Sequence, residues 1–233
     1  MLPFFMNHSI QKMYEPIAAS YERINHLLTL GLDRRWRKKL IQLAAGRAAE
    51  SWLDMCTGTG ETAVELYQKT GAKISAVDFS PAMLAEARKK SDPIDWIEAR
   101  ADALPFPDRH FDGITLSFAL RNLNENRAVC LSRLRELRRV LKPGGRFLML
   151  ETSQPKNPLI RLGFRLYIKW GIAPLGNRLS KTQGAYDFLA ASMRAFYSAD
   201  EWAALLREAG FAGLQIRPLL CGAAAIHTSI KPD

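Results

Sequence analysis

Apolar positions along the first part of the chain recur at helical spacing, and after residue 51 the pattern changes to alternating strands and helices. Residues 8–47 show the helical repeat, most clearly in the segments RINHLLTL and DRRWRKKLIQLAA. Asp33 is the expected N-cap of the second segment, and Gly46 is its expected end. The chain is therefore predicted to begin with a helical cap.

Short apolar runs alternate with amphipathic segments between residues 51 and 152. The expected strands are SWLDM, KISAVD, DWIEARAD, FDGITLSF and, after a KPGG turn, RFLMLET. The expected helices are ETAVELYQK, which ends at Gly71, then SPAMLAEARKK, with Ser80 as N-cap and Pro81 at its first position, and RAVCLSRLRELRRVL. This alternation predicts an α/β fold whose sheet is mainly parallel and has helices on both faces.

The last part of the chain breaks the alternation. SADEWAALLREAG reads as a helix capped by Ser198 or Asp200, and the strands GLQIRPLL and AAAIHTSI follow with no helix between them. Two consecutive strands predict an antiparallel hairpin at the edge of a seven-stranded sheet. The expected organisation is one domain, 1–233, made of the following parts: a cap at 1–50, a cofactor-binding core at 51–152, a helical insertion or lid at 153–195, and a C-terminal helix and hairpin at 196–233.

The segment LDMCTGTGE, residues 53–61, places a glycine loop directly after the first expected strand, where open parallel sheets bind ligands. A phosphate loop of the Walker type is excluded, because GETA stands where Lys-Ser/Thr would be needed. A dinucleotide fingerprint is matched imperfectly, since Ala63 replaces its third glycine, and Asp54 would repel a pyrophosphate. S-adenosylmethionine, which has a sulfonium and an ammonium group and no phosphate, fits this loop better.

Two further acids stand where such a cofactor needs them. Asp78 ends the second strand, 18 positions after Gly60, and is the expected acceptor for the ribose hydroxyls. Asp102, expected at the end of the third strand, can accept a hydrogen bond from the adenine amino group, with the backbone of Ala103 against the ring. Each acid alone could be a helix cap or a solvated turn residue. Three acids at successive strand ends predict a site for S-adenosylmethionine.

Composition narrows the class of protein. The 233 residues are 48% hydrophobic and 24% charged, as in globular proteins, and no apolar run has the length of about 18 residues that a membrane span needs. The opening MLPFFM is too short for a signal peptide, so a cytoplasmic location is expected. The cysteines Cys56, Cys130 and Cys221 match no disulfide or zinc pattern and are expected to be reduced and mostly buried. The net charge of +10 would attract nucleic acid, an anionic membrane surface or acidic ligands.

Several motifs together resemble a known family. LDMCTGTGE, VDFSPAMLAEAR, ADALPFPDRHFD, SFALRN and RVLKPGGRFLMLE resemble the class I S-adenosylmethionine methyltransferases, which implies a Rossmann-like fold. YERINHLLTLGLDRRWRKKL near the start, and YDFLAASMRAF with LREAGF near the end, look like the menaquinone/ubiquinone biosynthesis C-methyltransferases, the demethylmenaquinone methyltransferase-like enzymes. The resemblance covers nearly the whole chain. It implies methyl transfer to a ring carbon of a polyprenylated quinol, with S-adenosylhomocysteine as the second product.

The resemblance also implies site residues. It places cofactor contacts on Thr59, Asp78, Asp102, Ala103 and Ser117, and with the glycine loop the expected cofactor-binding set becomes Asp54, Cys56, Gly58, Thr59, Gly60, Asp78, Phe79, Asp102, Ala103 and Ser117. In SFALRN, Arg121 would stabilise a phenolate or polarise a water molecule, and Asn122 would orient the ring oxygen. Tyr21 is the third expected catalytic contact. The alternatives are a surface ion pair between Arg121 and Glu125, and plain burial of Tyr21.

No metal is expected, because the reaction needs none and the histidines His8, His26, His110 and His227 show no ligand spacing. Each histidine is expected to be a surface or core residue and not a catalytic one. One alternative function is methylation of another small aromatic molecule or of RNA, although the chain lacks an aromatic-rich strand face for nucleic acid. A second is a non-catalytic subunit of a quinone-synthesis complex, against which the intact acids and the Arg-Asn pair speak. A dimer is compatible with all of these.

The insertion carries the most distinctive charge pattern. From Thr152 to Tyr186 there is no acidic residue, and the bases Lys156, Arg161, Arg165, Lys169, Arg178 and Lys181 all fall there. Within PLIRLGFRLYIKW the bases recur every four residues, among Leu159, Ile160, Leu162, Phe164, Leu166, Tyr167 and Trp170. Such a helix is typical of a segment that lies on a bilayer surface. The alternative is a lid helix that packs its apolar side on the core.

Overall fold

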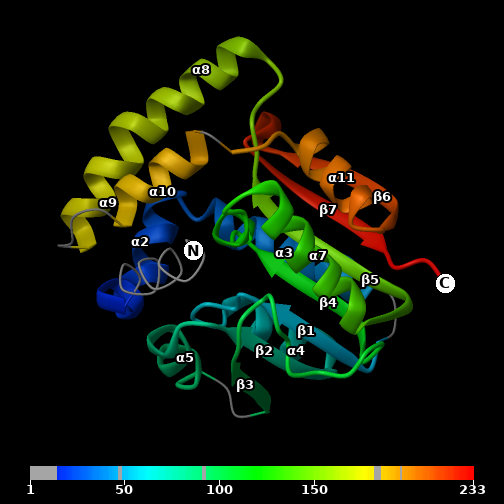
Figure 1. Ribbon diagram of the computed structural model, residues 1–233. Coiled ribbons are helices and arrows are strands. Elements are labelled where there is room, and N and C mark those ends of the chain that lie inside the picture. Colours follow the sequence, from blue (N-terminus) through cyan, green and yellow to red (C-terminus); the bar gives the residue numbers. More distant parts are fainter. Residues whose placement is uncertain (1–14, 47–48, 91–92, 181–184, 195) are drawn as a thin grey trace.

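The protein is a sheet sandwiched between helices, with a separate helical layer at one end (Figure 1). The computed structural model describes residues 15–46, 49–90, 93–180, 185–194 and 196–233. Seven strands form one sheet in the order β3-β2-β1-β4-β5-β7-β6. Their bounds are β1 Ser51–Met55, β2 Lys73–Asp78, β3 Ile94–Glu98, β4 Phe111–Ser117, β5 Leu141–Thr152, β6 Ala212–Leu219 and β7 Ala224–Ile230.

Strands β1 to β5 pair in parallel, and β7 is antiparallel to both of its neighbours. The predicted α/β sheet with an antiparallel edge hairpin is therefore confirmed. Strand β1 lies between β2 and β4, so the strand order reverses there and a crevice opens above the carboxyl ends of β1 and β4.

The helices that flank the sheet are held by local capping signals and by apolar faces. Ser80 caps its helix and Pro81 is that helix's first residue, and Ser198 forms a capping box with Glu201. The bounds are η1 Glu15–Ser20, α2 Tyr21–Leu28, α3 Leu32–Ala45, α4 Glu61–Thr70, α5 Pro81–Ala87, α6 Leu120–Leu123, α7 Arg127–Val140, α8 Pro158–Tyr167, η2 Ile168–Ile172, α9 Ala173–Ser180, α10 Ala185–Arg194, α11 Ala199–Glu208 and η3 Leu220–Gly222.

Three apolar cores organise these helices. One joins the sheet to α7 and α11, and a second joins the opposite face to α3 and α4. The third lies outside the sheet. It packs Ile24 and Leu28 of α2 against Met83 of α5, Ile168 of η2 and Met193 of α10. The N-terminal cap and the insertion therefore share one core, and together they cover the crevice at the carboxyl ends of the strands.

Three local expectations are wrong. The N-cap of α3 is Gly31, at φ +72°, and Asp33 lies inside the first turn, where its side chain contacts His26 and Thr29. Strand β3 ends at Glu98, so Asp102 stands in a turn beyond the strand. The KPGG segment lies within β5, where the register shifts, because Leu141 already pairs with Phe111.

Two compositional expectations also meet the structure. Of the cysteines only Cys130 is buried, whereas Cys56 is half-buried and Cys221 is exposed, so the expectation that most are buried is wrong. None of the described helices combines the length and the apolar character needed to cross a bilayer. The expected positions of His8 and Lys181 lie outside the described residues.

Candidate active site

A cavity of about 510 Å³ opens above the carboxyl ends of β1, β2 and β4. Most of the residues that the sequence singled out line it, and they come from the cap, the glycine loop, three strand ends and α6. These lining residues are Tyr21, Asp54, Cys56, Gly58, Thr59, Asp78, Phe79, Asp102, Ser117, Arg121 and Asn122. Gly60 and Ala103 are not among the residues that line it.

The glycine loop is shaped by hydrogen bonds to two buried acids. Gly58, at φ +57°, donates its backbone N–H to Asp78 Oδ2 at 2.8 Å, and a Cβ at this glycine would meet no described atom within 4 Å. The space beside Gly58 is therefore open for a ligand. Thr57 donates its hydroxyl to Asp54 Oδ2 at 2.6 Å, and Thr115 of the neighbouring strand donates to Oδ1. Asp54 of β1 thus fixes the start of the loop through Thr57.

Packing against β3, and not a contact with the cavity, explains why residue 60 is a glycine. Its φ is +87°, and a Cβ there would lie 2.5 Å from the ring of Trp96 on β3. A side chain at this position would clash with that ring. Gly60 is the N-cap of α4 and lets the start of this helix pack closely against β3. Because Gly60 does not line the cavity, the structure gives no support to the expected contact between Gly60 and the cofactor.

Burial raises the pKa of Asp78 to about 6, although backbone N–H groups of Ser80, Gly58 and Phe79 oppose the shift. Burial likewise raises the pKa of Asp54 to about 6, against the hydroxyls of Thr115 and Thr57. Both acids are charged above that pH, and Asp78 remains accessible from the cavity. A buried carboxylate at the end of β2 is a strong acceptor for a pair of hydroxyl groups.

Asp102 occupies a more exposed position than expected. Its side chain is 39% exposed and lies 2.8 Å from the guanidinium of Arg100, and the hydrogen bond from Arg100 lowers the pKa of this carboxyl. The backbone N–H of Ala103 donates to the carbonyl of Arg100 and closes the turn. Asp102 therefore stands at the rim of the cavity, already paired, and it can contribute less binding energy than Asp78.

Two buried side-chain oxygen atoms on the cavity wall have no hydrogen-bond partner among the described residues. They are Ser117 Oγ at the end of β4 and Asn122 Oδ1 in α6. Buried polar groups are nearly always hydrogen-bonded, so two unsatisfied atoms facing one cavity indicate places that a ligand fills. Both residues belong to the expected site.

Arg121 forms a buried ion pair, with a different partner from the one considered. Its Nη2 lies 2.9 Å from Glu151 Oε1 at the end of β5, and the two side chains are 6% and 0% exposed. Glu125 pairs with Arg133 of α7 at 2.8 Å. Because Arg121 is buried, the alternative that it serves only in a surface ion pair is wrong. Arg121 lines the cavity and Glu151 does not, so the guanidinium presents the positive end of this pair to a ligand.

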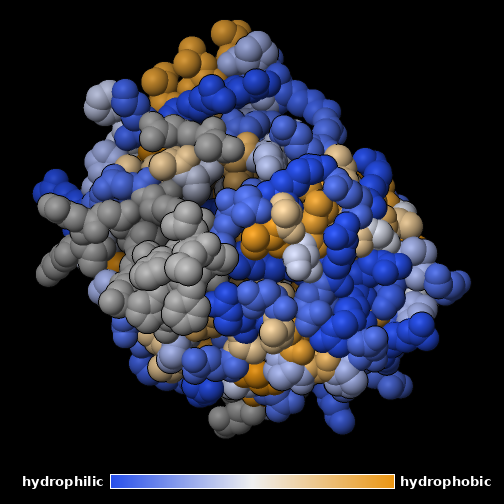
Figure 2. Space-filling model, viewed as in Figure 1, coloured by the Kyte–Doolittle hydropathy of each residue, from blue (hydrophilic) through white to orange (hydrophobic). Residues whose placement is uncertain are grey.

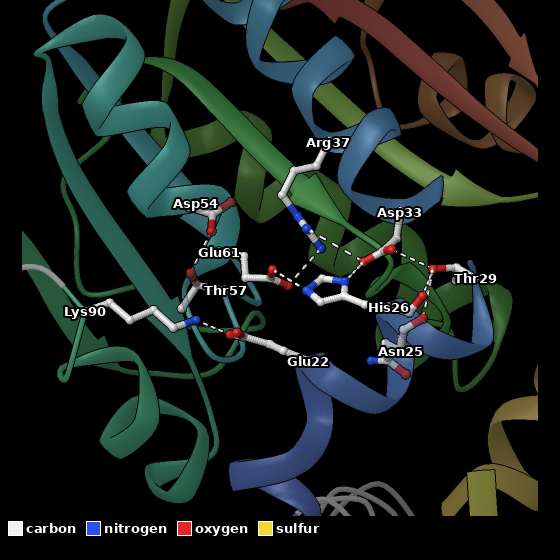
Figure 3. Close-up of polar contacts among 10 residues, drawn as sticks. All are labelled: Glu22, Asn25, His26, Thr29, Asp33, Arg37, Asp54, Thr57, Glu61 and Lys90. Atoms are coloured by element: carbon white, nitrogen blue, oxygen red, sulfur yellow. Dashed lines mark hydrogen bonds and ion pairs between the residues drawn. The ribbon is translucent and has the colours of Figure 1, made fainter. Parts of the chain in front are cut away.

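Sequence reasoning missed a polar cluster that joins the cap to the glycine loop (Figure 3). His26 lies with Nδ1 2.6 Å from Asp33 Oδ2 and with Nε2 2.9 Å from Glu61 Oε1. Arg37 of α3 reaches Glu61 Oε2 at 3.2 Å. Because Glu61 is the first residue of α4, the cluster fixes the cap against the loop. The available signal was the spacing of His26, Asp33 and Arg37 along the expected cap helices.

The histidines show no catalytic placement in the described chain. His227 is buried in β7, and His110 stacks on Phe106. Possible ligand atoms of Glu22, His26 and Glu61 lie within 4.8 Å of one another. Lys90 pairs with Glu22, and Arg37 with Glu61, so two cations already balance these carboxylates. A reaction without a metal remains the expectation.

Comparison with known proteins decides the family. The model of the ubiE/COQ5 methyltransferase family matches residues 5–231. The chain belongs to the ubiE/COQ5 methyltransferase family. A demethylmenaquinone methyltransferase of Clavibacter sepedonicus is 38% identical over 96% of this chain and 90% of its own length. A ubiquinone/menaquinone biosynthesis C-methyltransferase of Desulfotalea psychrophila is 36% identical over 95% of this chain and 90% of its own.

Solved structures agree on the fold of this ubiE/COQ5 family member. A [4+2]-cyclase, SpnF, superposes with a TM-score of 0.69 at 17% identity and covers 96% of this chain and 95% of its own. A methyltransferase dependent on S-adenosylmethionine from Aquifex aeolicus gives 0.59 at 18% identity, over 84% of this chain and 89% of its own. A cyclase among these neighbours shows that the fold alone does not settle the reaction.

As a ubiE/COQ5 methyltransferase the chain uses S-adenosylmethionine, and its residues fit that cofactor. The open space beside Gly58 would hold the middle of the cofactor molecule. Asp78 would bind its ribose hydroxyls, and the rim near Asp102 would bind its adenine. Ser117 Oγ, buried without a partner among the described residues, would gain one. When bound, the cofactor supplies an electrophilic methyl group on a positively charged sulfur.

Proposed function

We propose that this methyltransferase places the methyl group on a ring carbon of a polyprenylated quinol of the demethylmenaquinol kind. The names of the relatives that match nearly its full length support this substrate class. The observation that carries the proposal is the position of Arg121 and Asn122 on a cavity whose other wall is apolar. That wall includes Leu28, Phe79, Met83, Phe118, Phe164, Ile172, Leu189 and Met193.

The chemistry explains why such a cavity suits a quinol. A ring carbon becomes nucleophilic when a neighbouring hydroxyl loses its proton, because the negative charge delocalises onto that carbon. Bound S-adenosylmethionine would supply the methyl group to this carbon, and a carbon–carbon bond would form as the carbon–sulfur bond breaks, with S-adenosylhomocysteine as the leaving group. The ring carbon then loses its proton and aromaticity returns. The protein's main contributions are alignment of the two reactants and exclusion of water.

The chain's own residues supply the remaining assistance. Arg121, held by Glu151, stabilises the ionised hydroxyl, and the apolar walls strengthen this attraction by lowering the local dielectric. Asn122 lies next to Arg121 with a buried oxygen that has no partner among the described residues and that can accept a hydrogen bond from a ring hydroxyl. Tyr21 lies on the same cavity at the first turn of α2 and is the third contact.

The proposal predicts methyl transfer by the purified protein. With S-adenosylmethionine and a reduced demethylmenaquinol in detergent, mass spectrometry should show a quinone that is one methyl group heavier, and formation of S-adenosylhomocysteine should match it. Other small phenols and an RNA transcript serve as competing acceptors. Preferred methylation of either would overturn the quinol assignment. If the protein binds the cofactor but methylates no acceptor, the alternative of a non-catalytic subunit would be favoured.

A further inference from the structure

Helix α8 and the η2 turn that follows it present an apolar row to solvent. Leu159, Leu162, Leu166 and Trp170 recur every three or four residues, and they are 78%, 57%, 47% and 69% exposed. No residue of α8 is buried. Figure 2 shows apolar surface over this helix, bordered by strongly polar atoms. A lid that packs its whole apolar side on the core would bury this row, so the lid alternative does not account for it.

The opposite side of the same segment faces the protein. Phe164 and Tyr167 line the cavity, and Ile168 and Ile172 enter the core shared with the cap. The helix begins at a local signal, since Asn157 Oδ1 accepts hydrogen bonds from the N–H groups of Leu159 and Ile160. The segment therefore has two apolar faces. The inner face covers the cavity, and the outer row needs another explanation.

The positive charge around the outer row indicates which kind of partner covers it. The residues between Thr152 and Tyr186 include no acid. Arg165 and Lys169 are exposed beside the row, and Lys169 Nζ lies 4.9 Å above the ring of Trp170. In a symmetric dimer the same patch meets itself, so these bases would approach their own copies and repel. An anionic bilayer instead offers acyl chains to the leucines and negative headgroups to the bases.

The end of α8 packs beside a cavity that exposed leucines also line. The hydroxyl of Tyr167, at the end of α8, donates to the carbonyl of Leu28, just before the loop that carries Leu30. Leu30 and Leu220 both line the cavity while being 82% and 52% exposed. Exposed leucines at a cavity mouth are the expected rim for a substrate that enters from lipid.

We propose that α8 lies on an anionic bilayer, with its outer row among the acyl chains, and that the cavity receives the quinol from that surface. The direction of substrate entry rests on the proposed function, whereas the binding of α8 to lipid does not. The row continues toward Leu175 and Leu179 of α9, which are also exposed. Binding should be weak and sensitive to salt, because it combines a short apolar face with a few bases.

Flotation with vesicles tests the docking surface. At low salt the unmodified protein should float with vesicles that contain phosphatidylglycerol and much less with pure phosphatidylcholine. Leu162→Gln with Leu166→Gln, and separately Arg165→Glu with Lys169→Glu, should each weaken vesicle binding by about ten- to a hundredfold. The matched control is Lys38→Glu with Lys39→Glu, which removes the same charge from exposed positions of α3 and should bind nearly as the unmodified protein does.

Each other outcome counts against the proposal. Absence of vesicle binding by the unmodified protein, or equal losses in the α3 control, would overturn it. A concentration-dependent dimer that the Leu162→Gln and Leu166→Gln changes dissociate, without vesicle binding, would assign the row to a second copy. Calorimetric binding of S-adenosylhomocysteine verifies that each variant is folded. Methylation of a short-tailed quinol in detergent tests the proposed function separately, since it requires no bilayer.

A second inference concerns Arg37, a buried cation on the cofactor side of the cavity. Its side chain is 8% exposed and lines the cavity close to the glycine loop, and one nitrogen, Nη2, approaches Glu61. Nη1 lies 3.9 Å from Asp33 Oδ2, an ion pair too long for a hydrogen bond, and Nε and Nη1 are buried with no hydrogen-bond partner among the described residues. Two buried N–H donors without an acceptor indicate that a further hydrogen-bond acceptor belongs beside this guanidinium, and an anionic one binds it most strongly.

We infer that Arg37 binds the carboxylate of the methionine part of S-adenosylmethionine. The nucleoside part has its acceptors at Asp78 and the rim, so the amino-acid part extends over the glycine loop toward β1 and β4. Arg37 reaches that region from α3, and its charge acts on Asp54 of β1. Glu61 and Asp33 balance part of the charge of Arg37, and neither accepts a hydrogen bond from Nε or Nη1.

Two ligands separate this role from a structural one. Arg37→Gln should weaken binding of S-adenosylhomocysteine by about ten- to a hundredfold in calorimetry. Binding of 5′-methylthioadenosine, which lacks the amino-acid part, should change by less than about threefold. Arg37→Lys should restore part of the loss. Equal weakening of both ligands would make Arg37 a structural residue of the cap, and unchanged binding of both would remove it from the site.

Discussion

Turnover is expected to fall by about a hundred- to a thousandfold when Arg121 is replaced with Met, whereas affinity for S-adenosylmethionine is expected to stay within about a factor of three. Arg121 lines the cavity, and in the proposed function its positive charge stabilises the ionised ring hydroxyl. Losing that charge makes the ionised hydroxyl less stable. The glycine loop and Asp78, and not Arg121, are the expected contacts of the methyl donor. The measurement is single-turnover methyl transfer beside calorimetry of the cofactor.

Replacing Arg121 alone leaves its buried partner Glu151 without a cation and can destabilise the fold. A double variant avoids this effect. Without Arg121, Glu151 would lose its ion-pair partner at 0% exposure, and removing one partner of a buried ion pair destabilises a protein by about 3–5 kcal/mol. Glu151 still accepts hydrogen bonds from Leu120 N and Thr152 N, so Gln in its place keeps the shape and loses the charge. Arg121→Met with Glu151→Gln should therefore fold normally and remain slow.

A pH profile separates the electrostatic role from a structural one. If Arg121 lowers the pKa of the bound quinol hydroxyl, the rise of kcat with pH should move upward by about one to two pH units in the double variant, and each unit corresponds to about 1.4 kcal/mol. A mere loss of packing would lower kcat at every pH alike. Turnover equal to that of the unmodified protein would mean that the ion pair with Glu151 serves stability alone.

Features that depend on near neighbours in the chain were predictable. Ser80 with Pro81, Gly71 at the end of α4, and Ser198 with Glu201 are signals in which the residue itself supplies the turn or the cap. The alternation of strands and helices likewise fixed the sheet and its antiparallel edge. In each case the contacts that decide the structure lie within a few residues of one another.

Features that depend on distant partners were not predictable in this way. Glu125 seemed a natural partner for Arg121 because four residues separate them, but such pairs meet only on a continuing helix, and α6 already ends at Leu123. The real partner, Glu151, is 30 residues away and becomes a neighbour only when β4 and β5 pair. Asp33 carries the chemistry of an N-cap, yet contacts with His26 and Thr29 occupy its side chain.

The outer row of α8 shows a third kind of limit. Its period and its bases were plain in the sequence, but the same period suits a lid and a membrane-bound helix. Only the exposure of Leu159, Leu162 and Trp170 separates the face that packs on the protein from the face that does not. Amphipathic spacing shows that a helix has an apolar face. Three-dimensional packing shows whether the protein itself covers that face.

A large loss of cofactor binding is expected when Asp78 is replaced. Asp78→Ala should weaken S-adenosylmethionine binding by about ten- to a hundredfold, because a buried acceptor for the ribose hydroxyls contributes about 1–3 kcal/mol. The matched control is Asp102→Ala, which removes an acid from the rim, where the side chain is 39% exposed and already paired with Arg100. Its loss should cost clearly less, and calorimetry of both variants compares the two acids directly.

The pH dependence of binding provides an independent test of the same residue. Because burial raises the pKa of Asp78 to about 6, the carboxylate is the main form above that pH and the neutral acid is the main form below it. Hydroxyl donors of the ribose prefer the carboxylate, so affinity should be constant above about pH 7 and fall by up to tenfold per unit below about pH 6. Asp54 also has a pKa of about 6, but its oxygens accept from Thr57 and Thr115. In Asp78→Ala the acid-side fall in affinity should therefore shrink. An undiminished fall would assign the titration to Asp54, and unchanged affinity in Asp78→Ala at neutral pH would remove Asp78 from the site.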